Sequence, residues 1–407
     1  MKVLIAIMTL FGVAAAVRAQ VAPEATSQIK VGVSGTLTYS ARYSQIAEFY
    51  GGTTSQLANL SGNFGYSTTS ERHPTSITLG AGDSWGISGL SYNGGPYEDL
   101  SVSQGFAGQY SSLQLSDSVS YHRGIPIEQL GSTSSTAEPI LTLETRIVDN
   151  DVNAAYRYKL SGFTSLHLGG SYNQLDYPDG NGLGTDSLTV NGGLNHRLNA
   201  RNEIFGQYMY SEFSYTGNNL TIDANTALGG WQRTWTRRIS SSVAAGPQWI
   251  TFNSSTPIPS FVGYSVNASV TDTLRVGTAG LGVTHGVNGG GGYLYGSETD
   301  SVTGTFSRSF GHQTRSRITI GLAGGYTRTN TLGAAESVIL GAQGGYASKH
   351  GTAEASRRLG RLFTAYVSYS GTEQSLNSSS SSGALSGLFQ SVGFGIGFTP
   401  PQIHLRH

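Results

Sequence analysis

The feature that most constrains this chain is a strict two-residue alternation near its end, in the segment SVGFGIGF (391–398). Bulky apolar residues occupy every second position, and glycines fill three of the positions between them. Successive side chains of a β-strand point to opposite faces. The segment is therefore expected to form a strand with one apolar face and one nearly bare face, which is unusual for a strand in a soluble core.

The same alternation recurs in segments of about ten residues, for example 111–121, 164–172, 261–271 and 315–327. Globular strands average about five or six residues, whereas a strand that crosses a bilayer at a tilt needs about 9–11. One face is apolar and the other is small, polar or basic. The pattern therefore predicts an all-β fold, a single transmembrane antiparallel β-barrel of about 16–18 strands around a wet interior. A secreted sandwich or solenoid with shorter strands is the alternative.

The start of the chain predicts export. Residues 1–19 combine Lys2, an apolar run and small residues up to Ala19, as in a cleaved signal peptide. The remaining chain shows no linker rich in proline or charge, so one large domain is expected. We predict a signal peptide at 1–19, a short periplasmic segment at 20–28, the barrel at 29–398 and a periplasmic tail at 399–407. The short segment before the barrel leaves no room for a plug domain, which favours passive over energy-coupled transport.

Composition excludes several classes of function. The chain has no cysteine, so disulfides, thiol chemistry and cysteine metal sites are excluded. Without Lys2 and Arg18, the 24 basic residues fall to 22, against 24 acidic residues. That near-balance gives no electrostatic reason to expect nucleic acid as a partner.

The connections between predicted strands alternate in length. Short links are expected at 198–202, 236–239, 310–314 and 358–361, and long links rich in Gly, Ser, Asn and Pro at 83–98, 122–150, 175–186, 286–299 and 372–384. Tight periplasmic turns and longer external loops give such an alternation in outer-membrane barrels.

Several stretches resemble one group of proteins. RHPTSITLGAG (72–82), LSDSVSYHRG (115–124), the long segment 181–215, RRLGRLFTAYVSYSGTEQS (357–375) and the ending 388–406 are similar to uncharacterised, porin-like outer-membrane β-barrel proteins of Gram-negative soil bacteria. The resemblance implies an outer-membrane location and a barrel fold. It implies no catalytic or ligand-binding residue.

Catalysis is not expected. The nine histidines are scattered singly, and no HExxH or GxSxG spacing appears. We therefore predict no enzyme activity and no cofactor. The loop 176–186 offers Asp176, Asp179, Asn181 and Asp186 as calcium ligands, but its spacing is not that of an EF-hand, and a surface loop is the simpler interpretation.

The polar faces of the predicted strands supply the candidate lumen residues. Arg315, Arg317, His167 and Gln114 fall on these faces, and the two arginines are expected near the periplasmic mouth, where they would attract anions. Interfacial anchoring of the arginines is an equal alternative.

Two positions do not fit simply, while four tyrosines fit an interfacial role. Asp117 falls on the apolar face of its strand, so either it lies near a membrane interface or the register slips there. Pro247 interrupts a strand over 239–252 and suggests a bulge or the strand's outer end. Tyr121, Tyr172, Tyr215 and Tyr326 are expected in an interfacial girdle.

The function expected from these patterns is a porin-like passive channel for small solutes. A structural or adhesive surface barrel, and an enzyme in the barrel wall, are the alternatives. Expected partners are outer-membrane lipids, the barrel assembly machinery, periplasmic chaperones and small solutes, with a homo-oligomer possible.

The chain's ending is expected to direct assembly. Phe394, Ile396 and Phe398 should face lipid and form the signal that the assembly machinery recognises. Pro400 and Pro401 cannot extend a ladder and mark the end of that strand.

Overall fold

The computed structural model describes most of the chain between Gln28 and Arg406, namely residues 28–44, 54–68, 70, 72–89, 95–123, 146–179, 184–217, 220–254, 257–289, 296–311, 317–332, 345–376, 387–401 and 403–406. The predicted signal peptide and most of segment 20–28 lie outside these ranges. No helix in the described ranges is long and apolar enough to cross a membrane.

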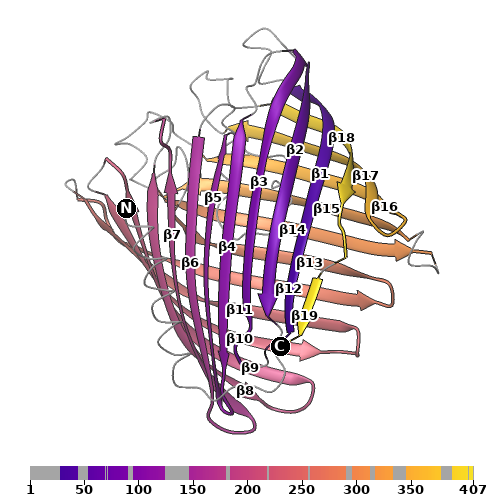
Figure 1. Cartoon of the computed structure of the whole chain (residues 1–407). Helices are drawn as coiled ribbons and strands as arrows, with labels where there is room; N and C mark the ends of the chain where they lie inside the picture. Colours follow the sequence, from indigo (N-terminus) through magenta and orange to yellow (C-terminus); the bar gives the residue numbers. More distant parts are fainter. Residues whose placement is uncertain are drawn as a thin grey trace.

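Eighteen long strands and one short strand form a single sheet (Figure 1). They are β1 (Gln28–Ser44), β2 (Thr54–Thr68), β3 (Thr75–Gly89), β4 (Pro96–Ala107), β5 (Ser111–Arg123), β6 (Arg146–Lys159), β7 (Thr164–Asp176), β8 (Thr185–Arg197), β9 (Asn202–Tyr215), β10 (Thr221–Thr234), β11 (Ile239–Asn253), β12 (Phe261–Leu274), β13 (Gly277–Asn288), β14 (Ser297–Phe310), β15 (Ile318–Thr331), β16 (Tyr346–Leu359), β17 (Phe363–Leu376), β18 (Gly387–Phe398) and β19 (Ile403–Arg406).

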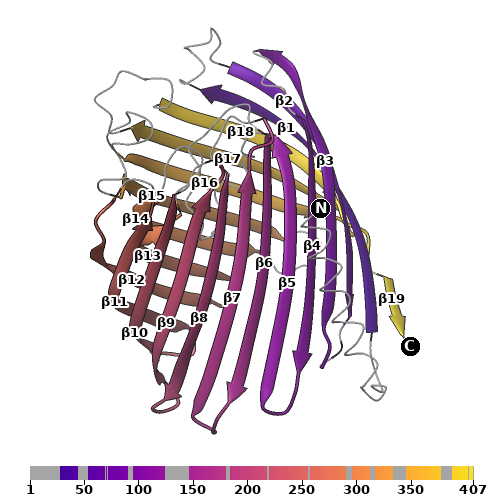
Figure 2. The ribbon, with the colours of Figure 1, turned by 90° about the vertical axis from the view of Figure 1, so that its left-hand side faces the viewer.

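The sheet closes on itself. Each strand from β1 to β17 pairs antiparallel with the next, and β18 pairs with β1 from Gly35↔Phe398 to Ser44↔Phe389. The ring is visible in Figures 1 and 2 as two walls of strands that face each other across an interior. The predicted fold, a barrel of 16–18 antiparallel strands, is confirmed with eighteen strands in the ring.

The links at the two ends of the barrel differ, as predicted. At one end, called here the short-turn end, β8 joins β9 through 198–201 and β16 joins β17 through 360–362. At the other, the long-link end, the connections include 124–145, 332–345 and 377–386. The predicted long links were drawn too wide, because β3 continues to Gly89, β6 begins at Arg146 and β13 continues to Asn288.

Three of the short turns share one local device. The side chains of Ser161, Asn199 and Thr236 each accept hydrogen bonds from two backbone N–H groups at the start of the next strand. Short polar side chains satisfy turn backbone in this way, so these positions explain why the chain reverses there.

Pairing does not end at the two prolines. β18 stops at Phe398 as expected, but Ile403–Arg406 resume pairing with the start of β1, from Val31↔Ile403 to Gln28↔Arg406. The four-residue strand β19 therefore covers the edge of β1 that β18 is too short to reach. The expectation of a plain tail after Phe398 missed this strand.

Pro247 neither ends β11 nor causes a bulge, so both readings of this position were wrong. It pairs with Tyr264 of β12, and the register of β11 with β10 is the same above and below it. Only the pairing of Gly246 and Pro247 with β10 is missing, as expected for a residue without an N–H donor.

Candidate functional site: the lumen

The two faces of the barrel wall have opposite character. Side chains that share a face with the large exposed apolar residues, such as Leu194, Val243 and Leu281, point outward. The alternate positions line the lumen and carry mainly Ser, Thr, Asn, Gly and charged residues. An apolar exterior around a polar interior suits a wall that separates lipid from water.

β18 shows this alternation most clearly. Val392, Phe394, Ile396 and Phe398 lie on the outer face, and Phe394 is 58% exposed. The glycines between them face inward, where Gly395 leaves room for the Tyr366 ring of β17; a Cβ on Gly395 would lie 2.6 Å from that ring. The bare face therefore gives space to an aromatic side chain from the next strand.

The inner faces of β3–β8, called here the open wall, are accessible from the lumen. Ser101, Ser118, Asn153 and Arg157 are exposed on this wall. A hollow of about 720 Å³ lies toward its short-turn end, and its lining includes Gln114, Asn153, Arg157, His167 and Asn191. The polar groups of this hollow are mainly neutral donors and acceptors together with one guanidinium.

Two of the sequence-predicted lumen residues, His167 and Gln114, therefore lie together in one hollow. His167 pairs across the sheet with Arg157 and Gly193. The imidazole occupies the space that a side chain at Gly193 would need, since a Cβ there would lie 2.5 Å from it. Of the two predicted arginines, Arg317 precedes β15 at the short-turn end and is exposed, and Arg315 lies outside the described residues.

A second, smaller hollow of about 300 Å³ lies on the open wall nearer the long-link end, with Asp99 and Asp149 in its lining. The Asp149 carboxylate accepts a hydrogen bond of 2.7 Å from the Asn173 amide, and neighbouring Asp151 accepts one from Asn153. Residues 122–150 were assigned to a loop, so the sequence analysis did not consider Asp149 as a lumen residue, nor its neighbour Asp151. Their spacing of two residues in DND (149–151) was the available signal.

The inner faces of β9–β12 differ at the long-link end, and this region is called here the packed wall. Ile222 and Ile250 are 0% exposed and form an apolar cluster with Phe213, Tyr215, Leu220, Ala224 and Leu332. The Tyr215 hydroxyl donates a 2.7 Å hydrogen bond to the carbonyl of Gly289, at the start of the link between β13 and β14. The inner face of this wall is therefore covered by an apolar cluster, in contrast to the accessible open wall.

The expected girdle role of Tyr215 is wrong, because its side chain faces inward and is buried in this cluster. Tyr326 does lie exposed on the outer face. Asp117 keeps its outward position in β5, paired with Val102 and Val152 without a register shift, so a register slip does not explain it, and its side chain is buried.

The acids of the predicted calcium loop make other contacts. Asp179 lies 3.7 Å from the Arg146 guanidinium, and Asp186 accepts a hydrogen bond from the Tyr172 hydroxyl. Asn181 lies outside the described residues. Within the described ranges, no group of three or more His, Asp or Glu side chains is arranged to hold a metal ion.

No protein-family model matches the chain, and no curated protein matches it. Solved structures of similar form include the outer membrane protein OpdK of Pseudomonas aeruginosa (11% identity, TM-score 0.47, covering 93% of this chain and 99% of that chain) and OccAB2 of Acinetobacter baumannii (10% identity, TM-score 0.48, 91% and 98%). OccK5 (OpdH) of Pseudomonas aeruginosa is similar at 11% identity and TM-score 0.46, with 92% and 98% covered. Sequence identities and TM-scores this low give no further support to the fold assignment, which rests on the strand register itself.

Proposed function

We propose that this protein is an outer-membrane channel through which small polar solutes pass passively. The open wall is the observation that carries the proposal. Its side chains are polar and accessible, while the outer face of the same strands is apolar. Barrels of 16–18 strands are wide enough to leave an aqueous path.

The experiment is conductance of the purified protein in a planar bilayer. Stepwise currents above background are expected. Arg157→Gln removes one positive charge from the open wall and should shift the reversal potential in a salt gradient toward cation preference. Arg328→Gln removes the same charge from an exposed outer-face position of β15 and should leave the preference unchanged.

A barrel without currents would overturn the channel and favour the structural or adhesive alternative. Equal shifts in the two arginine variants would instead show that the open wall does not line the path. Interaction with outer-membrane lipids, the assembly machinery and periplasmic chaperones, and assembly into a homo-oligomer, remain part of the proposal.

A further inference from the structure

Backbone pairing lapses along one seam, between β12 and β13 at the long-link end. Their ladder runs from Leu274↔Gly277 to Val266↔His285 and stops there. Both strands continue, over Phe261–Ser265 and Gly286–Asn288, and both stay paired with their other neighbours. Among the ladders that the structure describes, this is the longest lapse in which both strands go on. It is therefore a property of the seam and not of frayed strand ends.

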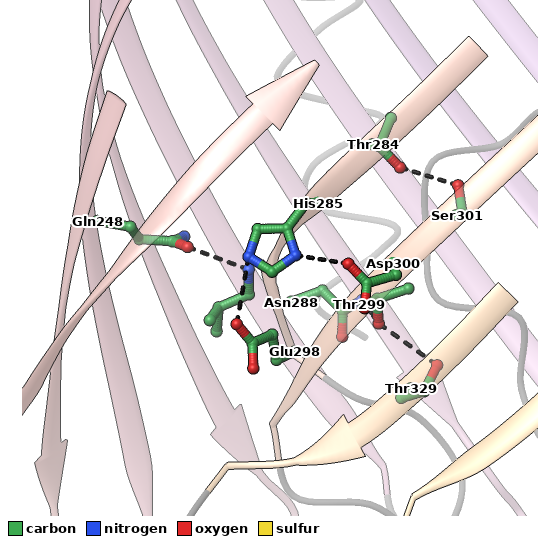
Figure 3. Close-up of polar contacts among 10 residues, drawn as sticks. Gln248, Thr284, His285, Asn288, Glu298, Thr299, Asp300, Ser301 and Thr329 are labelled. Carbon is green, nitrogen blue, oxygen red and sulfur yellow. Dashed lines mark hydrogen bonds and ion pairs between the residues drawn. The ribbon is translucent and has the colours of Figure 1, made fainter. Parts of the chain in front are cut away.

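Side chains bridge the seam where the backbone ladder is missing. The Val287 N–H donates a 3.1 Å hydrogen bond to Oε1 of Gln248, which lies on β11 and is buried. This bond satisfies a donor that would otherwise be unpaired in a membrane wall. Figure 3 shows Gln248 reaching toward β13 past the intervening strand.

A second bridge lies on the outer face. The Tyr264 ring of β12 stacks on the His285 ring of β13, with centroids 4.0 Å apart and an interplanar angle of 18°. His285 is held between two carboxylates of β14, with Nδ1 at 2.6 Å from Asp300 and Nε2 at 3.2 Å from Glu298 (Figure 3). The seam is thus closed by a few side-chain contacts that rotamer changes can break.

Apolar surface lies on both sides of the seam. Phe261 and Val287, one on each open edge, pack against the apolar cluster of the packed wall. On the outer face, Val262 and Tyr264 are exposed. A route across the seam would therefore pass Val262 and Tyr264 outside and Phe261 and Val287 inside, with the acids of β14 at its rim, and would not cross the polar open wall.

We infer that the β12–β13 seam is a lateral port for an apolar, uncharged molecule, which moves through it between the lumen and the lipid of the outer membrane. The inference rests on the proposed channel function and assigns a second class of solute to the same barrel. Glu298 and Asp300 at the rim disfavour an anionic molecule, and the apolar cluster inside disfavours a strongly hydrated one. The structure shows the closed form, and opening requires release of the Gln248 bond and the Tyr264–His285 stack.

A disulfide tests this port directly, because the chain has no cysteine of its own. A Cβ on Gly286 would lie 3.8 Å from the Cβ of Ser265, which is the usual separation in a disulfide. The variant Ser265→Cys/Gly286→Cys is therefore expected to lock the seam on oxidation. Ser269→Cys/Gly282→Cys crosses the same two strands at a position already paired and is the matched control.

The readout is the influx of N-phenyl-1-naphthylamine, an apolar dye that fluoresces in membranes, into intact cells that carry each variant in the outer membrane. Oxidation of the 265/286 variant should reduce influx to the rate of cells without the protein, and reduction should restore it. Oxidation of the 269/282 control should leave dye influx unchanged. Heat-modifiable migration verifies that each barrel is folded.

Unchanged dye influx in the locked barrel would overturn the port. If the double variant fails to fold, Gln248→Leu decides, because loss of the Val287 bond should raise influx, and an unaltered rate would overturn the inference. Planar-bilayer conductance separates this result from the channel proposal. A locked barrel that still conducts ions leaves the channel standing, and a barrel that admits the dye but never conducts overturns the channel alone.

Discussion

The open wall and the packed wall are built from the same alternating pattern, yet their inner faces behave differently. On the open wall, inward side chains such as Ser101 and Asn153 stay exposed, and two hollows lie against the strands. On the packed wall, the corresponding positions Ile222 and Ile250 are fully buried in an apolar cluster. The difference shows that one side of this barrel serves as a water-facing surface and the other as a small hydrophobic core.

The strongest test of this comparison places a carboxylate on each wall. Ile222→Asp buries a charge among apolar side chains and should destabilise the barrel by about 4 kcal/mol or more, or prevent folding. Ser101→Asp on the open wall meets water and should change stability by less than about 0.5 kcal/mol. Urea unfolding in detergent measures both. Similar losses in the two variants would show that the walls do not differ.

The next effect concerns assembly at β18, the strand that closes the ring. Phe398 lies on the outer face with its ring 5.4 Å from that of Phe363. Phe398→Ala should lower the amount of folded barrel in the membrane severalfold, because it removes the terminal aromatic of the predicted assembly signal. Leu359→Ala, also exposed on the outer face at the short-turn end, is the control and should have little effect. Normal yield and normal heat-modifiable migration of the Phe398 variant would contradict the prediction.

A smaller effect is expected from two tyrosine hydroxyls. Tyr215→Phe leaves the Gly289 carbonyl of the packed wall without its 2.7 Å partner and should cost about 1–2 kcal/mol. Tyr97 donates a longer bond of 3.4 Å to Asn59 on the inner side near the open wall, where water can replace it. Tyr97→Phe should therefore leave the free energy of unfolding nearly unchanged in the same urea measurement. An equal loss of stability in the two variants would show that the two walls do not differ in this respect.

The smallest expected effect is a gain in stability. Asp117 lies on the outer face of β5, behind the open wall, with valines as its cross-strand neighbours. Asp117→Leu should raise the free energy of unfolding by about 1 kcal/mol, since a buried acid beside apolar neighbours is unfavourable. Val243→Asp makes the reverse change on the outer face of β11 and should lower stability. A loss on Asp117→Leu would mean that the carboxylate has a partner in the membrane.

The alternation along the strands is enough to assign part of the inner face. His167 and Gln114 occupy polar-face positions of two clear strands, and the structure places both in one hollow. Asp149 was missed because the strand boundary, not the alternation, was wrong in the segment 122–150 that was assigned to a loop. Tyr215 was misplaced for another reason: both faces of β9 carry aromatics, so its sequence does not distinguish the inner face from the outer.

The sequence by itself determined the class of fold, the even number of strands within a narrow range, and the apolar outer face of β18. It did so because the period of a strand is two residues and because hydrocarbon requires every backbone group to be paired within a closed ladder. Only the tertiary structure decided which inner faces are filled and which are open, where β19 pairs, and where the ladder between β12 and β13 lapses. These features depend on contacts between residues far apart in the chain, such as Tyr215 with Gly289 or Gln248 with Val287. Local alternation carries no information about such pairs.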